Sequence, residues 1–341
     1  MSFVEESSPL VSLIIVYWNS AKYLSRCLKS ISLQSFKNFE IIIIDNGSSD
    51  QGLKDLEKNY SKLHLSIEHP KSNIGFAAAN NLGAQLARGK WLVLLNTDAF
   101  PEPDWLEKLI SASRSHPEIA SFSSRQIQAN APSYLDATGD AYHVSGLAWH
   151  IDSDYPSEHY GLESRKIFSP CAASAMYLRQ AFEDVGGFDE DFFSYFEDVD
   201  LGFRLQLRGY RSFYVSDAIV HHVGSATLGA KSDFAFYYVH RNLIWTFVKN
   251  MPSPLLWRYL PAHLFANLIY VLYYTLRGRG KVLWLAKWHA LKSWKEILHK
   301  RQLIQAQTRA TAAEMKQLME HGFFQPYLLG YKRRKALQMK S

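Results

Sequence analysis

Residues 40–50 read EIIIIDNGSSD, in which four consecutive isoleucines end abruptly at a polar turn that begins with Asp45. A continuous apolar run of this kind is typical of a strand that is buried on both faces. A second such run, VSLIIVY, precedes it at Val11–Tyr17, and Leu24–Ile31 between the two carries apolar residues at helical spacing. A strand, a helix and a strand in this order predict a βαβ unit and therefore a parallel sheet.

The following segments continue the same pattern. Leu63–Ile67 alternates like a strand, a helix of small residues extends to about Ala87, and Trp91–Leu95 (WLVLL) is another buried strand. Asp98 comes just after that strand, as Asp45 does after its own, so both are expected at the edge of the sheet where ligands bind. The alternative for Asp45 is an ordinary polar turn. Neither GxGxxG nor a P-loop pattern follows these strands, which argues against NAD and ATP-hydrolysing sites.

The length, the cysteine content and the N-terminal sequence of the chain limit the classes of protein to which it can belong. A chain of 341 residues is long enough for one large domain with an appendage, or for two domains. Its two cysteines, Cys27 and Cys171, offer neither metal-site spacing nor a disulfide framework, which predicts a reducing compartment. The N-terminal MSFVEESSPL does not read as a secretory signal.

Charge is distributed unevenly along the chain. Residues 241–341 hold 18 Lys and Arg against 3 Asp and Glu, whereas the preceding 240 residues hold 20 against 29. A basic tail on an acidic body fits an anionic membrane surface or nucleic acid. Because the sequence matches no nucleic-acid-binding module, we expect no nucleic-acid partner.

The most acidic stretch, Gly186–Leu205, reads GGFDEDFFSYFEDVDLGFRL and interleaves carboxylates with aromatic residues. A helix is predicted to begin near Glu197, which places Glu197 and Asp198 in its first turn, where the helix dipole favours carboxylates. Two interpretations remain open from the residues alone. The stretch is either a helix start over an aromatic core or a pocket that holds a carboxylate against a substrate.

Two further segments contain histidines. Ile127–Phe168 reads as an irregular polar insertion, which is more typical of a binding loop than of regular structure. This insertion carries His143, His150 and His159, to which the sequence assigns no role. His221 and His222 follow an apolar run that is expected to be a strand, and such histidines are by default core or surface residues.

Five segments in order resemble family 2 glycosyltransferases of the GT-A fold, and in particular the rhamnosyltransferase-like group that builds bacterial surface polysaccharides. They are VSLIIVYWNS (11–20), IIIIDNGSSD (41–50), NIGFAAANNLGAQLARGKWLVLLNTDA (73–99), the acidic stretch at 186–205 and HHVGSAT (221–227). The resemblance covers residues 9 to about 228. It implies an α/β fold with a mostly parallel sheet sandwiched by helices, and an inverting transfer of a sugar from a nucleotide-diphosphate sugar to a hydroxyl.

The resemblance also implies roles for residues on the donor side. Asp45 matches the aspartate that contacts the nucleobase or its ribose. Asn73, Gly75 and Asn81 fall in the segment that lines the donor nucleotide. Asp98 matches the last acid of the DxD motif, here Asn96-Thr97-Asp98, which holds Mg²⁺ or Mn²⁺ against the diphosphate.

The remaining implied roles concern the metal and the acceptor. His222, with His221 as the alternative, matches a further metal ligand. Asp198, with Glu197 as the alternative, matches the base that takes the proton of the acceptor hydroxyl, and an inverting displacement needs one such carboxylate.

The resemblance leaves the substrates open. The leading donor is dTDP-rhamnose, and the alternatives are a UDP-hexose or UDP-galactofuranose transferase, or a catalytically inactive scaffold. The implied acceptor is a glycan or a polyprenyl-diphosphate-linked sugar. The Gln-x-x-Arg-Trp motif of processive synthases does not occur in the sequence, so we expect transfer of one or a few sugars per binding event.

The segment after the resemblance predicts a separate function. We divide the chain into a catalytic domain, residues 1–228, and a helical, basic, aromatic extension, residues 229–341. The apolar run Leu264–Leu276 is too short to span a bilayer, which needs about 20 residues. A basic run at 332–335 lies near the C-terminus.

A stripe of apolar residues in this extension predicts a helix that lies on a membrane surface, with tryptophans at the headgroup level and lysines reaching the phosphates. The stripe comprises Trp284, Trp288, Leu291, Trp294 and Leu298, flanked by Lys281, Lys287, Lys292 and Lys295. The alternative is a helical subdomain packed on the catalytic body. The first interpretation predicts a cytoplasmic protein held peripherally at the inner face of the plasma membrane.

Overall fold

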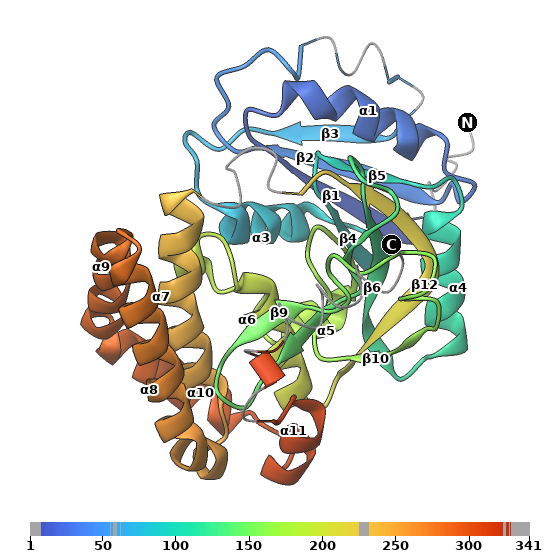
Figure 1. Ribbon diagram of the computed structural model, residues 1–341. Helices are drawn as coiled ribbons and strands as arrows, with labels where there is room; N and C mark the ends of the chain where they lie inside the picture. Colours follow the sequence, from blue (N-terminus) through green and yellow to red (C-terminus); the bar gives the residue numbers. More distant parts are fainter. Residues whose placement is uncertain are drawn as a thin grey trace.

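A large mixed sheet forms the centre of the molecule (Figure 1). The computed structural model describes residues 8–54, 56, 60–61, 63–224, 232–322, 325–326 and 328. The strands are β1 (Val11–Tyr17), β2 (Phe39–Asp45), β3 (Leu65–Glu68), β4 (Trp91–Leu95), β5 (Ala99–Pro101), β6 (Ile119–Gln128), β7 (Leu135–Ala137), β8 (Asp140–Tyr142), β9 (Ala148–His150), β10 (Arg165–Ile167), β11 (Ser174–Leu178) and β12 (Arg211–His222). Their order is β10-β12-β6-β11-β4-β1-β2-β3, with β5 beside β12 and β7 beside β6, while β8 and β9 form a separate pair.

The half of the sheet that the sequence predicted is parallel. β3, β2, β1 and β4 run in the same direction, so Asp45 and Asp98 lie at the same edge, as expected. The other half departs from a mostly parallel sheet, because β11 runs antiparallel to both β4 and β6. The chain enters β11 at the edge where β4 ends, with Ser174 opposite Leu95, and this direction of entry makes the sheet mixed.

Helices cover both faces of the sheet (Figure 1). They are α1 (Ala21–Ser32), α3 (Phe76–Leu86), α4 (Trp105–Ser115), α5 (Arg179–Asp184) and α6 (Glu197–Arg208). Alternate residues of the buried strands face opposite ways. Leu13 and Ile15 of β1 therefore pack with α1 and α4, whereas Ile14 packs with α3, α5 and α6.

Helix α6 lies between two hydrophobic cores. It begins at Glu197, as predicted. Leu201 and Leu205 pack toward the sheet, and Val199 and Phe203 pack toward the C-terminal helices. The aromatic residues of the acidic stretch therefore serve in part to anchor this helix, which carries Glu197 and Asp198 in its first turn.

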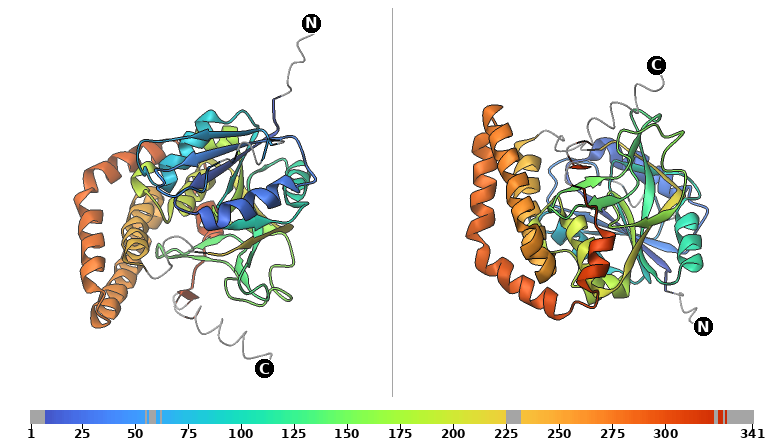
Figure 2. Two further views of the ribbon diagram at one scale, coloured as in Figure 1. Left: turned by 90° about the horizontal axis from the view of Figure 1, so that it is seen from above. Right: turned by 60° about the horizontal axis from the view of Figure 1, so that its bottom comes forward.

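The C-terminal helices pack against α6 and form an outer layer of the molecule (Figures 1 and 2). They are α7 (Asp233–Asn250), α8 (Ser253–Leu276), α9 (Gly280–Lys292), α10 (Trp294–Ala306) and α11 (Ala312–Leu318). α7 contacts α6, α9 and α10, and Trp245 and Phe247 of α7 share one buried cluster with Phe203 of α6. The expected boundary at 228–229, Ser225–Thr227 of the last motif and the basic run at 332–335 lie outside the described residues.

The insertion predicted to be irregular, Ile127–Phe168, contains the short strands β7–β10. Much of it is buried; Tyr142 is 0% exposed and stacks on Phe168. The sequence did not reveal these strands, because each is only three residues long, too short to show a periodic pattern. The insertion is therefore a packed part of the domain, and some of its residues line a cavity next to Asp198.

The apolar run Leu264–Leu276, which the sequence predicted to be too short to span a bilayer, is part of the longer helix α8. The helix has 24 residues with a mean hydropathy of 1.2 over its most apolar window, of which 17% is buried. Length and composition alone qualify it as a candidate span, a criterion that some helices of soluble proteins also meet. The sequence suggested a shorter segment because Arg258, Pro261 and His263 precede Leu264, but His263 is buried and stacks on Phe247 of α7 at 3.9 Å between ring centres.

The predicted apolar stripe is divided between two helices, because α9 ends before Ser293 and α10 begins after it. Trp284, Trp288 and Trp294 are nevertheless exposed, by 58%, 64% and 48%. Lys287 differs from the prediction. Its Nζ is buried and donates to the carbonyl oxygen of His240 at 3.0 Å and to Asn267 Oδ1 at 2.5 Å, so it does not reach toward a membrane.

Candidate active site

A cavity of about 400 Å³ opens at the edge of the sheet where β1, β2 and β4 end. Loops after these strands, the start of α3, the loop before α6 and the start of α7 supply its walls. The lining residues are Val16, Trp18, Ser20, Asn46, Asn73, Gly75, Phe76, Asn96, Thr97, Asp98, Phe193, Ser194, Tyr195 and Phe234. We refer to it as the donor cavity.

Polar groups fix one wall of the donor cavity. Asn46 Nδ2 donates to Asn73 Oδ1 at 3.1 Å, and Asn46 Oδ1 accepts from the backbone N–H of Ile74 at 2.8 Å. Asn73 Oδ1 also accepts from the N–H of Gly75 at 2.9 Å. Gly75 has a φ of +88°, and a Cβ there would lie 2.7 Å from the Phe193 ring, so only glycine fits this close approach.

Not every predicted donor residue lines this cavity. Asn73, Gly75 and Asp98 do. Asp45 lies at the end of β2 beside Asn46, with Oδ2 3.1 Å from His69 Nδ1, but it is not part of the lining. The structure does not bring Asn81 to the cavity, because its side chain bonds to the backbone of Phe188 and so ties α3 to the turn after α5.

Asp98 and His222 meet at the floor of the site. His222 Nε2 lies 3.4 Å from Asp98 Oδ1, and both residues are buried. His222 Nδ1 lies 2.8 Å from Asp136 Oδ2, while Nε2 has no hydrogen-bond partner within the described ranges. A histidine fixed on one nitrogen by a carboxylate, with its other nitrogen free beside a second carboxylate, is the usual arrangement of a metal ligand.

The charges around His222 favour a protonated ring when no metal ion is bound. Burial lowers the pKa of His222, but Asp136 and Asp98 outweigh it and raise the pKa to about 9. A metal ion would therefore have to displace a proton from the ring. His221, the alternative ligand, points elsewhere, because its Nε2 lies 2.8 Å from Glu102 Oε1.

Sequence reasoning missed Asp136. It lies in β7, within the insertion, and is 86 residues from His222. The two acids of the segment Leu135–Asp140 (LDATGD) were the available signal, but a sequence does not reveal which distant histidine an acid approaches.

Asp198 and Glu197 line a second cavity, of about 530 Å³, which we call the acceptor cavity. Phe76, Asn96, Ser194 and Tyr195 line both cavities, so the two adjoin. Asp98 faces the donor cavity, Asp198 faces the acceptor cavity, and His222 lies in the wall of the latter.

The two adjacent acids differ in their surroundings. Asp198 Oδ2 accepts from the backbone N–H of Ala172 at 3.1 Å, and Oδ1 accepts from that of Val199 at 2.8 Å. Burial and the charge of Asp140 nevertheless raise the pKa of Asp198 to about 6. Burial and the charge of Asp198 raise the pKa of Glu197 well above its usual range, and Glu197 Oε2 has no partner among the described residues. At neutral pH Asp198 is therefore the ionised acid of the pair.

The loop before α6 is held in an unusual backbone conformation. Phe193, Tyr195 and Phe196 have φ values of +63°, +67° and +68°. For bulky residues each such conformation costs about 1–3 kcal/mol unless the surroundings impose it. Asn242 of α7 supplies that support, as its Nδ2 donates to the carbonyl oxygens of Phe192, Ser194 and Tyr195 at 2.7–3.0 Å.

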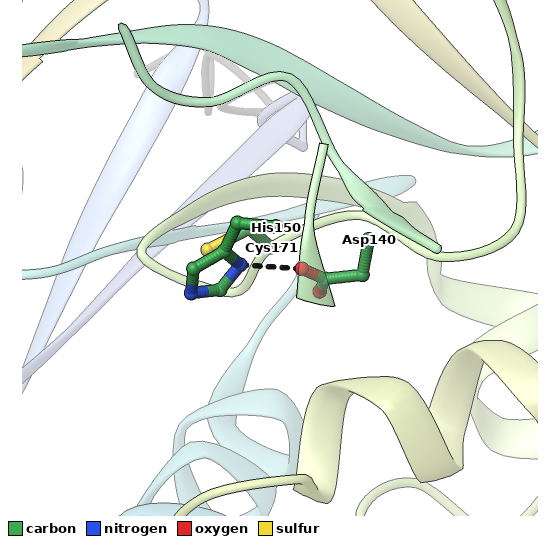
Figure 3. A group of neighbouring side chains, drawn as sticks. All are labelled: Asp140, His150 and Cys171. Carbon is green, nitrogen blue, oxygen red and sulfur yellow. Dashed lines mark hydrogen bonds and ion pairs between the residues drawn. The ribbon is translucent and has the colours of Figure 1, made fainter. Parts of the chain in front are cut away.

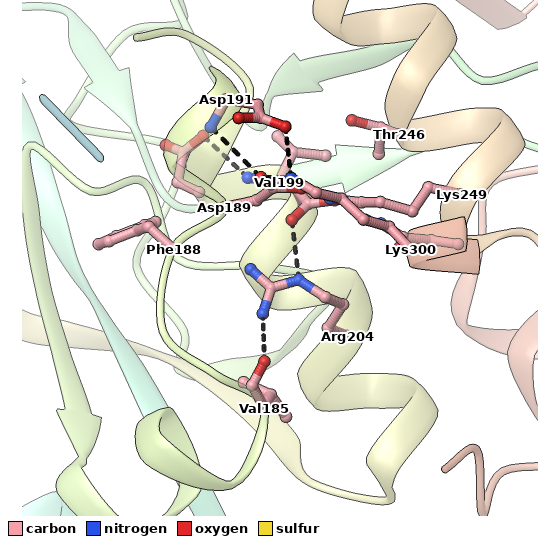
Figure 4. Close-up of polar contacts among 12 residues, drawn as sticks. Val185, Phe188, Asp189, Asp191, Val199, Arg204, Thr246, Lys249 and Lys300 are labelled. Carbon is pink, nitrogen blue, oxygen red and sulfur yellow. Dashed lines mark hydrogen bonds and ion pairs between the residues drawn. The ribbon is translucent and has the colours of Figure 1, made fainter. Parts of the chain in front are cut away.

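A buried charge network joins residues on either side of this loop (Figure 4). Lys249 of α7 is 0% exposed, and its Nζ lies 2.5 Å from Asp189 Oδ2 and 2.8 Å from Asp200 Oδ1. Arg204 Nε donates to Asp200 Oδ2 at 2.8 Å, and Lys300 bonds to Asp189 from α10 at 2.5 Å. Several acids of the stretch 186–205 thus pair with C-terminal cations, and the sequence did not reveal this pairing.

Asp140, His150 and Cys171 form a third group, in the wall of the acceptor cavity (Figure 3). One ligand atom from each lies within 4.8 Å of the others, a spacing that also suits a metal ion. The sequence assigned His150 no role, and the structure brings it to the site.

Comparisons with known proteins agree with this architecture. The family model described as glycosyl transferase family 2 matches residues 12–186. An uncharacterized glycosyltransferase of Haemophilus influenzae is 34% identical over 121 residues, which are 35% of this chain and 37% of that protein. The chain thus spans little more than a third of that relative's length.

Two other proteins are informative. The N-acetylglucosaminyl-diphospho-decaprenol L-rhamnosyltransferase of Mycobacterium tuberculosis is 27% identical over 240 residues, with 64% of this chain and 78% of that protein covered. The structure of a mannosyltransferase from Pyrobaculum calidifontis with GDP-mannose and Mn²⁺ superposes with a TM-score of 0.52 at 16% identity, and covers 98% of this chain and 89% of that one. At this identity the superposition shows a shared fold. Because the family's model matches half of the sequence, the chain belongs to glycosyl transferase family 2.

Proposed function

We propose that this protein is an inverting, metal-dependent glycosyltransferase that moves a sugar from a nucleotide-diphosphate sugar to an acceptor hydroxyl. The observation that carries the proposal is the pair of adjoining cavities, one with Asp98 and the other with Asp198. A donor in the first cavity and an acceptor in the second would meet at their shared wall.

The leading substrates follow from a relative. The mycobacterial protein is named for rhamnosyl transfer to N-acetylglucosaminyl-diphospho-decaprenol. We propose dTDP-rhamnose as the donor and a polyprenyl-diphosphate-linked or glycan acceptor, in the synthesis of a cell-surface polysaccharide.

Residues of the donor cavity would hold the nucleotide. Asn73 and Gly75 present a rigid polar wall, and Trp18 offers an aromatic surface for the base. Asp45, which precedes the lining residue Asn46 in the chain, is proposed to meet the base or ribose. Asn81 is omitted from the proposed site because its amide is already bonded to Phe188.

Asp98 and His222 would hold Mg²⁺ or Mn²⁺, with Asp136 orienting the imidazole. The unpartnered, buried His222 Nε2 fits this role. An imidazole nitrogen beside a carboxylate favours Mn²⁺ over Mg²⁺, which prefers oxygen ligands. When bound, such an ion neutralises the charge that develops on the diphosphate leaving group.

Asp198 is proposed as the base. Its two backbone hydrogen bonds hold the carboxylate in one orientation in the acceptor cavity. Its raised pKa makes it a stronger proton acceptor than an ordinary aspartate while it stays ionised at neutral pH.

The proposal can be tested by measuring nucleotide binding to the wild-type protein and to variants of the two adjacent histidines, His221 and His222. We expect calorimetric titration with UDP, dTDP and GDP to detect binding of one nucleotide that depends on Mn²⁺. His222→Ala should weaken it at least about tenfold, because metal sites lose that much even when an outer-shell partner is removed. His221→Ala should change it little, because His221 pairs with Glu102 outside the site.

Either of two results would count against this proposal. If the two histidine variants weaken nucleotide binding equally, His222 is not a metal ligand. If the folded wild-type protein binds none of the nucleotides, the inactive scaffold becomes the better interpretation.

We also propose that α8 and α9 associate with the anionic inner face of the plasma membrane from the cytoplasm. Their outward side carries large apolar side chains that are at least 45% exposed, namely Trp257, Leu264, Phe265, Leu268, Leu272, Tyr273, Leu276, Trp284, Leu285, Trp288 and Leu291. Lys281 and Lys292 are exposed beside them. An apolar patch this extended marks an interaction surface, and basic neighbours suit an anionic bilayer.

The double variant Leu272→Glu/Trp288→Glu should reduce binding to phosphatidylglycerol vesicles by at least about tenfold in a sedimentation assay, since each buried large side chain contributes about 1.5–3 kcal/mol. Leu33→Glu is the control, because Leu33 is 58% exposed on the catalytic body. Equal losses in both variants, or sedimentation that is unchanged in the double variant, would contradict the proposed surface.

A further inference from the structure

Asp140 and His150 form a charge pair that points into the acceptor cavity. They lie directly opposite each other in the β8–β9 pair, and His150 Nδ1 is 2.5 Å from Asp140 Oδ1. The Asp140 side chain is 2% exposed and that of His150 is 50% exposed. The second ring nitrogen of His150 lies on the side of the ring opposite Asp140 (Figure 3).

The pair is connected to the proposed base through two consecutive residues. Cys171 lies against His150, and the N–H of the next residue, Ala172, donates to Asp198 Oδ2 at 3.1 Å. Asp140 Oδ2 is buried and has no hydrogen-bond partner among the described residues. A buried carboxylate whose second oxygen is unpaired is costly, which is a reason to look for a ligand beside it.

The walls of the acceptor cavity indicate the class of ligand. Trp149, Tyr195 and Phe196 supply apolar surfaces suited to the C–H faces of a sugar ring. The charges of Asp140 and Asp198 are offset by His150 and His222 in the same lining, so no strong positive charge is left over to hold a phosphate. A neutral, hydroxylated ring therefore fits this cavity better than the diphosphate of a lipid carrier.

We propose that His150, oriented by Asp140, binds the acceptor sugar by donating a hydrogen bond from Nε2–H to a ring hydroxyl near the one that Asp198 deprotonates. This inference rests on the proposed function and assigns the acceptor subsite within it. Asp140 is a positioning residue, because it acts through the imidazole.

The charge of His150 has a second consequence for Asp198. Burial lowers the pKa of His150, but Cys171 and Asp140 raise it well above its usual range. Because the Cys171 thiol is protonated at neutral pH, the Asp140 carboxylate is the charge that favours the imidazolium there. The charge of the imidazolium acts to lower the pKa of Asp198, against the larger effects of burial and Asp140. The other titratable groups near the pair and the base are Asp136 of β7, Cys171, Tyr177 of β11 and Glu197 of α6.

A metal ion held by Asp140, His150 and Cys171 is the competing assignment. Burial raises the pKa of the Cys171 thiol to about 11, so this sulfur is protonated rather than a ready ligand. The metal content of the purified protein distinguishes this metal site from a sugar-binding role for His150. A stoichiometric ion that is lost in His150→Gln but kept in His222→Ala would overturn our proposal.

The test compares His150→Ala and His150→Gln with the control His159→Gln, which alters an exposed histidine beside Glu158. The donor is dTDP-rhamnose and the acceptor is N-acetylglucosaminyl diphosphate with a short prenyl chain. We expect His150→Ala to lower kcat/KM for the acceptor by about 10–100-fold, the effect of losing a charge-assisted hydrogen bond. The donor Kd should stay within about twofold of wild type, because His150 does not line the donor cavity.

A pH profile adds a readout that a purely structural role would not move. Without the positive charge, the pKa of Asp198 should rise, so the acidic limb of the rate profile should shift to higher pH in His150→Gln. Wild-type acceptor kinetics in His150→Ala, or equal losses in transfer and in donor binding, would overturn the inference alone. A folded wild-type protein that binds no nucleotide sugar would overturn the proposed function and this inference with it.

Discussion

Replacing Asp198 with asparagine is expected to lower the rate of sugar transfer by about 10²–10⁴-fold, the usual contribution of a general base. Asparagine keeps the size of the side chain and accepts the N–H of Ala172, but it cannot take a proton from the acceptor. Donor binding should be retained, because Asp198 faces the other cavity. Single-turnover transfer, measured together with nucleotide affinity, separates the two effects.

Glu197→Gln is the matched control for this prediction. The pKa of Glu197 is raised well above its usual range, so its carboxyl is already neutral and glutamine resembles it. We expect a loss of less than about tenfold, far below that of general-base removal. A larger loss in Glu197→Gln than in Asp198→Asn would reverse the assignment of the base.

The pH dependence of the wild-type enzyme should follow Asp198. Because the base acts in its ionised form and its pKa is raised to about 6, the transfer rate should fall below about pH 6 and level off above it. If the transfer rate instead falls only near pH 4, the base is an aspartate with an ordinary pKa.

Replacing Lys249 with methionine is expected to destabilise the fold by about 3–5 kcal/mol, the typical cost of removing one partner of a buried ion pair. Methionine fills much of the space of the stem, but Asp189 and Asp200 would be left buried without their shared cation. Urea unfolding of the full chain at neutral pH measures this change.

Lys300→Met provides the comparison, because the Lys300 side chain is 31% exposed and also bonds to Asp189. A partly exposed pair contributes about 1 kcal/mol or less. Burial acts to raise the pKa of Asp189, but Lys249 and Lys300 hold it well below its usual range, so its stabilising effect is lost as pH falls. The difference in the free energy of unfolding between wild type and Lys249→Met should therefore become smaller as the pH falls to 4 and below. Equal destabilisation by both lysine variants would contradict the central position of Lys249.

Local pattern predicted the parallel half of the sheet well. The bounds of β1 and β4 match the predicted runs because buried strands leave continuous apolar letters in the sequence. The start of α6 was also predicted, since carboxylates in a first turn precede its apolar periodicity. The antiparallel direction of β11 could not be predicted, because it depends on the edge at which the chain enters the sheet.

The candidate site was predicted only in part, for a related physical reason. Asp98, His222 and Asp198 lie in recognisable motifs, and the structure brings them to adjoining cavities. Asp136 meets His222 across 86 residues, so tertiary packing sets that pair, whereas His150 meets Asp140 within the β8–β9 pair, whose short strands the sequence did not reveal. Asn81 shows the converse, since it lies in a donor motif but faces the turn after α5.

The bonds from Asn242 to the carbonyl oxygens of Phe192, Ser194 and Tyr195 bear on how hybrid enzymes should be built. A chimera joined at residue 228 would combine the strained loop of one parent with the supporting amide of another. The crossover is better placed in the turn at Met251–Pro252, which follows α7 and precedes α8. A graft at that turn would exchange the exposed apolar helices while each catalytic loop keeps the asparagine that shapes it.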